Sequence, residues 1–225
     1  MARGHKVRGF DIRESSPIVD AIVGDISDAA AVALAMTGID AVVHLAATPD
    51  EDDFPSKLLP NNIVGLYNVL EGARKAGVRR IVLASTGQVV MGHKGPWPIT
   101  PDMPFSPRNW YGSAKVMAEV AAQFFAHVHG LSVIVARLGW CPRDKAHAEQ
   151  LRRDEFGKDV YLSPGDAGRF FVCAVEAPAD LRHCVVFATS KPVRKARYDI
   201  TAAAELLGFS PRDTWPEGTE GIAEG

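Results

Sequence analysis

The stretch Arg80-Ile-Val-Leu-Ala-Ser-Thr86 is a nearly continuous apolar run that ends on two hydroxyl side chains. Such a run is typical of a parallel strand that is covered on both faces of its sheet. The runs AVVHLA at 41–46 and SVIVARL at 132–138 have the same character. Helix-like segments separate the three runs, and this alternation predicts a doubly wound α/β fold around a parallel sheet.

Turn residues and helical periodicity predict the elements on either side of these runs. Gly77 follows a predicted helix at 60–76 and Gly130 follows one at 111–129, each in the position that favours a left-handed residue. We also expect strands at 6–10, 21–25 and 184–188, helices at 28–36, 167–177 and 200–207, and an irregular segment at 141–160. The tail from 211 to 225 is rich in Gly, Pro and Glu, and we expect it to be loosely ordered.

Composition excludes several classes of protein. The 225 residues are 47% hydrophobic and 23% charged, with 25 basic and 27 acidic side chains, so there is no basic excess for nucleic acid or an anionic membrane. No apolar run is long enough to span a bilayer, and the N-terminus lacks the apolar core of a signal peptide. The three cysteines have no paired spacing, which disfavours disulfides and a zinc site. We expect a cytoplasmic protein without a metal.

Tyr111-Gly-Ser-Ala-Lys115 opens a predicted helix and is the most specific chemical pattern in the chain. Residues four apart share a helix face, so the phenol and the ammonium point the same way. A nearby ammonium lowers the pKa of a phenol and makes it usable as a proton acceptor. The alternative interpretation is a solvated helix face.

Ser85 and Thr86 directly follow a buried strand, and ligands bind at the carboxyl ends of strands in open α/β sheets. A hydroxyl group there can orient a substrate oxygen toward the tyrosine. The alternative role of these two residues is to cap a helix or form a turn.

Three other strand ends carry residues suited to a nucleotide. Asp11 can accept hydrogen bonds from both hydroxyls of a ribose. Asp25-Ile26 can flank an adenine, and the small residues of Leu45-Ala46-Ala47 let a flat cofactor approach the backbone. Turn formation and packing are the plain alternatives.

Together these segments resemble the extended short-chain dehydrogenase/reductase group, the NAD-dependent epimerase/dehydratase family. The matching pieces, in the family's order between Val7 and about Leu138, are Gly24-Asp25-Ile26, Asp40–Ala47, Asn62-Ile-Val-Gly65 with Tyr67-Asn68, Arg80–Thr86 and Tyr111–Lys115. The resemblance implies a Rossmann-like fold and NAD as the cofactor. Asp11 matches the acidic residue that favours NAD over NADP, although Arg13 close by keeps NADP open.

The resemblance also implies a role for each site residue. Tyr111 is the acid/base, Lys115 is its electrostatic partner and a ribose ligand, and Thr86 orients the substrate, with Ser85 as the alternative hydroxyl. Asn62 matches an asparagine that fixes its helix and the proton path. The implied cofactor contacts are Asp11, Ile12, Asp25, Ile26, Leu45, Ala46, Ala47, Asn62, Tyr111, Lys115 and Leu138. The implied substrate contacts are Gln88, Thr86, Tyr111 and Arg152.

Within this family the chain looks most like uronate dehydrogenases, because of Asn62–Asn68, Arg137-Leu-Gly-Trp-Cys141 and a short C-terminal part. We therefore expect residues 1–140 to form the NAD-binding core and 141–225 a small substrate-binding part of the same domain. The expected reaction is NAD-dependent oxidation of a hydroxyl on a sugar or sugar acid. A nucleotide-sugar epimerase or dehydratase and a catalytically silent relative are the alternatives.

Two further expectations concern the residues that bind a substrate carboxylate and the oligomeric state of the protein. Arg143, Arg152 and Arg153 are candidate clamps for a substrate carboxylate, because a guanidinium fork matches that group, and solvated arginines are the alternative. In relatives, helices matching 60–76 and 111–129 pair across a dimer axis, so we expect a homodimer.

One family feature is not in this sequence. The chain starts with Met1-Ala-Arg-Gly-His-Lys-Val7, which matches the end of the family's first helix and the start of its second strand. The family's first strand and Gly-rich turn lie in the middle of the sheet, between the strands near Val7 and Ala41, and hold the cofactor's pyrophosphate. The chain is a fragment or starts at a wrongly chosen initiator, a neighbouring chain supplies the pairing, or the protein is a degenerate relative. The intact Tyr111 and Lys115 favour the first explanation, and we expect weak NAD binding by the 225-residue chain.

Overall fold

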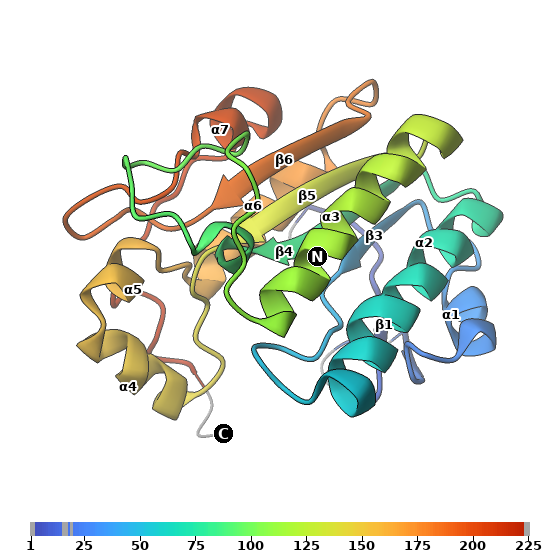
Figure 1. The fold of residues 1–225 in the computed structure, drawn as a ribbon. Coiled ribbons are helices and arrows are strands. Elements are labelled where there is room, and N and C mark those ends of the chain that lie inside the picture. The colour runs from blue at the N-terminus through green and yellow to red at the C-terminus, as the bar shows by residue number, and fades with distance from the viewer. Residues whose placement is uncertain (1–2, 15–17, 19, 223–225) are drawn as a thin grey trace.

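In the computed structural model, which describes residues 3–14, 18 and 20–222, six parallel strands form two separate sheets (Figure 1). The strands are β1 (Arg8–Asp11), β2 (Asp20–Val23), β3 (Ala41–His44), β4 (Arg80–Thr86), β5 (Ser132–Leu138) and β6 (His183–Ala188). The helices are α1 (Ala29–Ala35), the π-helix η1 (Phe54–Val64), α2 (Gly65–Ala76), the 3-10 helix η2 (Gly87–Val90), α3 (Trp110–His129), α4 (Lys145–Arg153), α5 (Glu155–Asp159), α6 (Pro164–Val175) and α7 (Thr201–Leu207). The predicted α/β class is confirmed.

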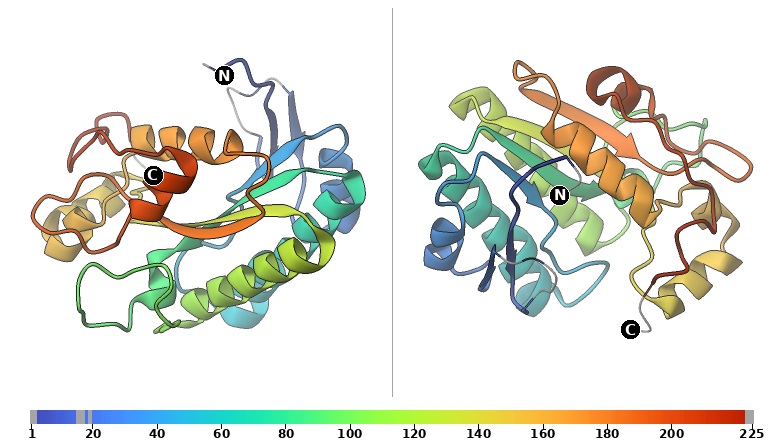
Figure 2. Two further views of the ribbon diagram at one scale, coloured as in Figure 1. Left: turned by 90° about the horizontal axis from the view of Figure 1, so that it is seen from above. Right: turned by 180° about the vertical axis from the view of Figure 1, so that it is seen from behind.

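The larger sheet has the order β3-β4-β5-β6 and is covered on both faces (Figure 2). Successive side chains of a strand point to opposite faces, so Ile81 and Leu83 pack with α1, α2 and α3 on one side. Val82, between them, packs with α6 and α7 on the other side. Burial on both faces explains why the central strands are apolar without alternation.

The two sheets are separated where the sequence led us to expect a gap. β1 pairs with β2 and β3 pairs with β4, and no strand of the described residues pairs with the facing edges of β1 and β3. A hollow of about 1810 Å³ lies between these edges. Its lining includes Val7, Phe10, Ala41, Val43, Phe171 and Val175. The hollow is therefore flanked by one unpaired edge of each sheet.

The helix predicted at 60–76 begins earlier than expected. Asp53 accepts a hydrogen bond from the backbone N–H of Ser56 at 3.0 Å, and the π-helix η1 then runs from Phe54 into α2. Pro60, the first residue of the predicted helix, lies inside η1.

The longest helix, α3, has 20 residues. Among the described residues, no helix combines the length and apolar character that a membrane span requires.

The segment 141–160, predicted to be irregular, contains α4 and α5. Asp144 caps α4 by accepting the N–H of His147 at 2.7 Å, and Asp154 caps α5 by accepting the N–H of Gly157 at 2.8 Å. Leu151 is the buried residue of α4. Phe156 of α5 packs against Trp97 and Tyr198, and the buried Asp159 binds Arg197 at 3.1 Å. These short helices therefore depend on caps and on contacts with segments that are distant in sequence.

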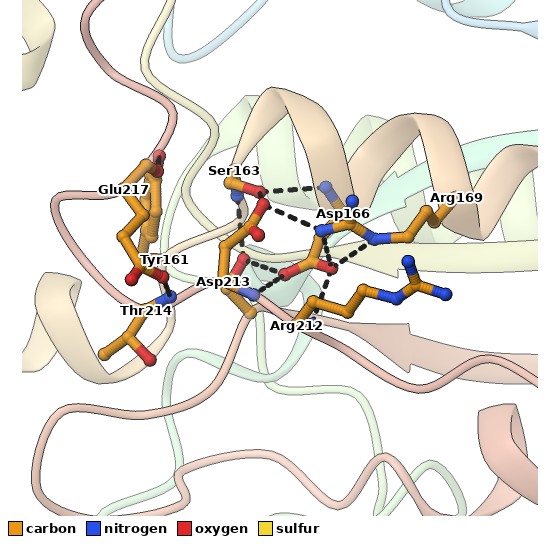
Figure 3. Close-up of polar contacts among 9 residues, drawn as sticks. Tyr161, Ser163, Asp166, Arg169, Arg212, Asp213, Thr214 and Glu217 are labelled. Atoms are coloured by element: carbon orange, nitrogen blue, oxygen red, sulfur yellow. Dashed lines mark hydrogen bonds and ion pairs between the residues drawn. The ribbon is translucent and has the colours of Figure 1, made fainter.

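The tail from residue 211 is bound to the protein as far as Glu217, contrary to the expectation of loose order (Figure 3). The buried Asp166 carboxylate accepts the backbone N–H groups of Arg212 at 2.9 Å and Asp213 at 3.0 Å. Farther along, Tyr161 donates its hydroxyl to the carbonyl oxygen of Glu217 at 2.8 Å. The buried carboxylate at the start of α6 and the hydroxyl of Tyr161 thus hold a segment that is distant in sequence.

Candidate active site

α3 brings Tyr111 and Lys115 to the carboxyl end of the larger sheet. Asn109 starts the helix by accepting the N–H of Gly112 at 2.8 Å. A Cβ on Gly112 would lie 3.1 Å from the carbonyl oxygen of Gln88, so glycine permits the close approach of α3 to η2. The small residues after the tyrosine therefore serve to seat the helix against the end of β4.

Lys115 is buried beneath the tyrosine. Its Nζ donates to the carbonyl oxygen of Ala84 at 2.9 Å and lies 5.8 Å from the centre of the Tyr111 ring. Burial lowers the pKa of Lys115 to about 8, and the nearby Glu119 carboxylate opposes that shift. The ammonium is thus fixed beside the phenol as the helical spacing predicted.

The pKa of Tyr111 departs from the expectation. Burial raises it to about 12, and the Asp50 carboxylate adds to the rise, whereas Arg143 and a hydrogen bond with Thr86 lower it. The sequence predicts that Lys115 lowers this pKa below the ordinary value, and the structure gives the opposite direction. Desolvation outweighs the neighbouring cations in this structure, because a buried phenolate loses its hydration.

The two hydroxyl residues at the end of β4 have different environments. Thr86 accepts the N–H of Gln88 at 3.2 Å, and it lies close enough to Tyr111 to lower the pKa of that phenol. Ser85 is buried and donates to Glu119 at 2.5 Å, and Glu119 forms an ion pair with Arg137 at 2.9 Å. Adjacent strand residues point to opposite faces, so only Thr86 is directed to the tyrosine and the hydroxyl of Ser85 is committed to the core.

Asn62 fixes the loop that follows β3. Its Oδ1 accepts the backbone N–H of Thr48 at 2.8 Å, and its Nδ2 donates to the carbonyl oxygen of Thr48 at 3.0 Å. The side chain is 5% exposed, and these two bonds give it a positioning role in the structure. The predicted role in a proton path stays a prediction.

The predicted cofactor contacts are spread over four strand ends. Asp11 and Ile12 are exposed at the end of β1, Leu45 is exposed after β3, and Ala46, Ala47 and Leu138 are half-buried. The Asp25 carboxylate accepts the N–H and hydroxyl of Ser27 at 2.8 Å each, so it also forms a turn, and these bonds lower its pKa. Ile26 is 9% exposed and packs in the core, where a Cβ on Gly65 would lie 2.6 Å from it, and its predicted contact with the cofactor stays a prediction.

The residues fit part of a dinucleotide. Tyr111 and Lys115 offer a hydroxyl and an ammonium to one ribose, and the exposed Asp11 carboxylate suits the hydroxyls of another. Among the described residues, no glycine-rich turn leads from the gap between β1 and β3 into a helix, where backbone N–H groups would bind a diphosphate. The described residues therefore fit the two riboses of the dinucleotide, but they do not provide a complete site for its diphosphate.

The candidate substrate residues divide into two groups. Gln88 contacts Asp50 at 3.2 Å and Asn109 at 2.9 Å, close to the tyrosine. Arg143 forms an ion pair with Asp50 at 2.8 Å and acts on the pKa of Tyr111, so it also belongs to the site.

Arg152, predicted to bind substrate, lies apart from these residues in its contacts, and its predicted role stays a prediction. It is exposed on α4 and pairs with Glu149 at 2.6 Å, and Arg153 binds the same carboxylate at 2.8 Å. Both arginines thus form ion pairs on the surface of α4, with a glutamate three or four residues before them.

Sequence reasoning missed Asp50, Glu51 and Asn109. Asn109 was detectable as an N-cap residue directly before the helix. Asp50 and Glu51 lie in an acidic stretch that looks like a solvated loop, and only the fold brings them to α3, where Glu51 accepts the backbone N–H of Tyr111 at 2.9 Å.

Comparison with known proteins agrees with this arrangement. Residues 1–140, more than half of the chain, match the family described as NAD dependent epimerase/dehydratase. An L-arabinose 1-dehydrogenase (NAD(P)(+)) of Haloferax volcanii is 31% identical over 230 residues, which cover 95% of this chain and 89% of that protein. A uronate dehydrogenase of Pseudomonas putida is 33% identical over 200 residues, covering 89% of this chain and 70% of that protein.

A solved structure is also similar. A mutant uronate dehydrogenase from Agrobacterium tumefaciens, complexed with NAD, has a TM-score of 0.74 at 28% identity and covers 92% of this chain and 75% of its own. Parallel sheets between helices, with a Tyr–Lys helix at the strand ends, define a Rossmann-like oxidoreductase fold. The chain belongs to the NAD dependent epimerase/dehydratase family, and its relatives include NAD(P)-dependent sugar and sugar-acid dehydrogenases.

Proposed function

We propose that the chain is an NAD-dependent oxidoreductase that acts on a hydroxyl of a sugar or sugar acid. The observation that carries the proposal is the position of the buried Lys115, whose Nζ is held by the carbonyl oxygen of Ala84 at 2.9 Å and lies 5.8 Å from the centre of the Tyr111 ring. Thr86, at the end of the same strand, acts on the pKa of Tyr111. The relatives that oxidise L-arabinose and uronates support the substrate class. We assign the core chemistry to residues 1–140 and part of the substrate contact to residues 141–225, which contribute Arg143.

The chemistry of the protein's own residues follows from their positions. Thr86 and Tyr111 hydrogen-bond the substrate hydroxyl, and Tyr111 accepts its proton. Lys115, with a pKa of about 8, is mostly protonated at pH 7 and stabilises the phenolate that forms. NAD supplies the hydride acceptor when it is bound.

The residues that would hold NAD are those that fit its riboses. Tyr111 and Lys115 serve the ribose next to the reacting ring, and Asp11 serves the ribose of the adenosine. Asp11 favours NAD over NADP, because a carboxylate repels a 2′-phosphate.

A homodimer is the expected assembly. The outer face of α3 exposes Met117 (52%), Val120 (52%), Phe124 (49%) and Val128 (63%), which recur at helical spacing. Tyr67 of the neighbouring α2 is also exposed (61%). An apolar stripe of this kind favours a protein interface. Sedimentation of the wild type as a dimer and of Val120→Glu as a monomer would support it, and a monomeric wild type would overturn it.

The test of the function is the formation of NADH, measured by absorbance at millimolar NAD with aldoses and uronates. We expect Tyr111→Phe to lose about 10²–10⁴-fold in kcat, because it lacks the proton acceptor. Tyr67→Phe, which removes a hydroxyl from an exposed tyrosine of α2, is the matched control and should keep the wild-type rate. Retention of activity within tenfold by Tyr111→Phe would contradict the proposal. Interconversion of sugar isomers without net NADH would indicate an epimerase instead.

A further inference from the structure

Asp50 has the most unusual backbone near the site. Its φ of 61° lies in the left-handed region, and it is the single non-glycine residue with a positive φ in the described part of the chain. Asp tolerates this conformation better than most residues, although at some cost. Outliers of this kind are concentrated where function needs a side chain in a particular place.

The Asp50 side chain is held from two sides. One carboxylate oxygen, Oδ1, accepts from Gln88 Nε2 at 3.2 Å, and the other, Oδ2, accepts from Arg143 Nη2 at 2.8 Å. Gln88 in turn accepts from Asn109, the N-cap of α3, at 2.9 Å. The carboxylate is therefore fixed to the helix end that carries Tyr111.

Both members of the Asp50–Arg143 pair act on the tyrosine hydroxyl. The carboxylate raises the pKa of Tyr111 and has a larger effect than Arg143, which lowers it. The two side chains are 48% and 49% exposed, so a solute at the tyrosine can reach them. The carboxylate of Asp50 is therefore within electrostatic reach of the tyrosine hydroxyl.

We propose that Asp50 is a specificity residue that selects a neutral sugar over a sugar acid. Its carboxylate accepts hydrogen bonds from sugar hydroxyls, and it repels a substrate carboxylate brought to the same place. Arg143 then holds Asp50 and does not clamp a substrate acid. This inference rests on the proposed function and narrows its substrate class to neutral aldoses.

The experiment measures equilibrium binding to the 225-residue chain at pH 7, by saturation-transfer NMR and calorimetry. The probes are D-galactose against D-galacturonate and D-glucose against D-glucuronate, pairs that differ only in a CH₂OH or a carboxylate. The variants are Asp50→Asn, Arg143→Gln and Asp52→Asn. Asparagine tolerates the left-handed backbone, so Asp50→Asn preserves the loop. Asp52→Asn removes the same charge two residues away, where the carboxylate caps the N–H of Asp53, and is the matched control.

We expect the wild type to bind each aldose at least tenfold more tightly than its uronate. Asp50→Asn should reduce that ratio at least tenfold, Arg143→Gln should increase it, and Asp52→Asn should leave it unchanged. A wild type that prefers the uronates, an unchanged ratio in Asp50→Asn, or no binding of any of the four sugars would overturn the inference. NADH formation is scored separately, so turnover with a preference for uronates would uphold the proposed function while rejecting the role of Asp50.

Discussion

Replacement of Arg80 by methionine tests how β4 is attached to α6. Arg80 is 7% exposed, and its guanidinium donates to Ser132 Oγ at 3.0 Å and to a group of backbone carbonyl oxygens at the end of α6. The accepting carbonyls belong to Ala174 at 3.4 Å, Val175 at 3.1 Å, Ala177 at 2.6 Å and Pro178 at 2.6 Å. Burial lowers the pKa of Arg80, but these acceptors, at the negative end of a helix dipole, keep the guanidinium favourable there.

The expected cost follows from the two shortest bonds. A hydrogen bond to a charged group contributes about 1.5–3 kcal/mol, and leaving a buried carbonyl without a donor costs a similar amount. Allowing for partial rehydration, we expect Arg80→Met to lower the free energy of unfolding by about 3–4 kcal/mol, a large part of the ~5–15 kcal/mol typical of a domain.

The assay is urea unfolding followed by circular dichroism, with the free energy taken from midpoint and slope. Arg79→Met is the matched control, because Arg79 is the adjacent residue, is 79% exposed, and pairs with an Asp40 that is 83% exposed. Exposed pairs contribute little, so the control should unfold like the wild type. A loss of less than about 1 kcal/mol in Arg80→Met, or an equal loss in both variants, would refute this account of the α6 anchor.

Three further predictions concern acid stability, close packing and cofactor affinity. Burial alone would raise the pKa of Asp166, but it accepts hydrogen bonds that lower this pKa below the ordinary value of 3.8, from Arg212, Ser190, Arg169 and Asp213. The ionised carboxylate therefore stabilises the folded protein above the pKa of the unfolded state. That stabilisation is lost as the pH falls through the lower pKa of the folded state. Asp166→Asn should therefore destabilise the protein at pH 7 and flatten its loss of stability below pH 4 in acid unfolding curves, and parallel curves would contradict this. Gly139→Ala should prevent soluble folding, because its Cβ would lie 2.1 Å from the carbonyl oxygen of Val160, whereas Gly168→Ala, with nothing within 4 Å, should not lower the melting temperature. Calorimetric titration of the 225-residue chain should show NAD binding at millimolar or weaker affinity, since the described residues lack a diphosphate site, and a micromolar dissociation constant would reject that expectation.

The strands and the helix that carries Tyr111 and Lys115 could be predicted from local patterns. Continuous apolar runs identified β3, β4 and β5, because burial on both faces of a parallel sheet removes the polar alternation. The four-residue spacing placed Tyr111 and Lys115 on one face of α3, as helix geometry requires. The gap between β1 and β3 was expected from the family resemblance, which places a further strand between the strands near Val7 and Ala41.

Other features depended on contacts between distant segments. Ser85 and Thr86 are adjacent hydroxyl residues, and only the pleat of β4 in the assembled sheet sends one to Glu119 and the other to Tyr111. Asp50 and Arg143 are 93 residues apart and meet at the end of α3.

Local patterns in the chain were enough to predict the α/β class, the buried strands and the pairing of a phenol with an ammonium along one helix. The tertiary structure decided the burial that raises the pKa of Tyr111, the arginine that reaches the site, and the fixed position of the tail on Asp166. The physical reason is that periodicity and spacing are local properties of the chain. Desolvation and long-range ion pairs, in contrast, arise only when several elements have packed together.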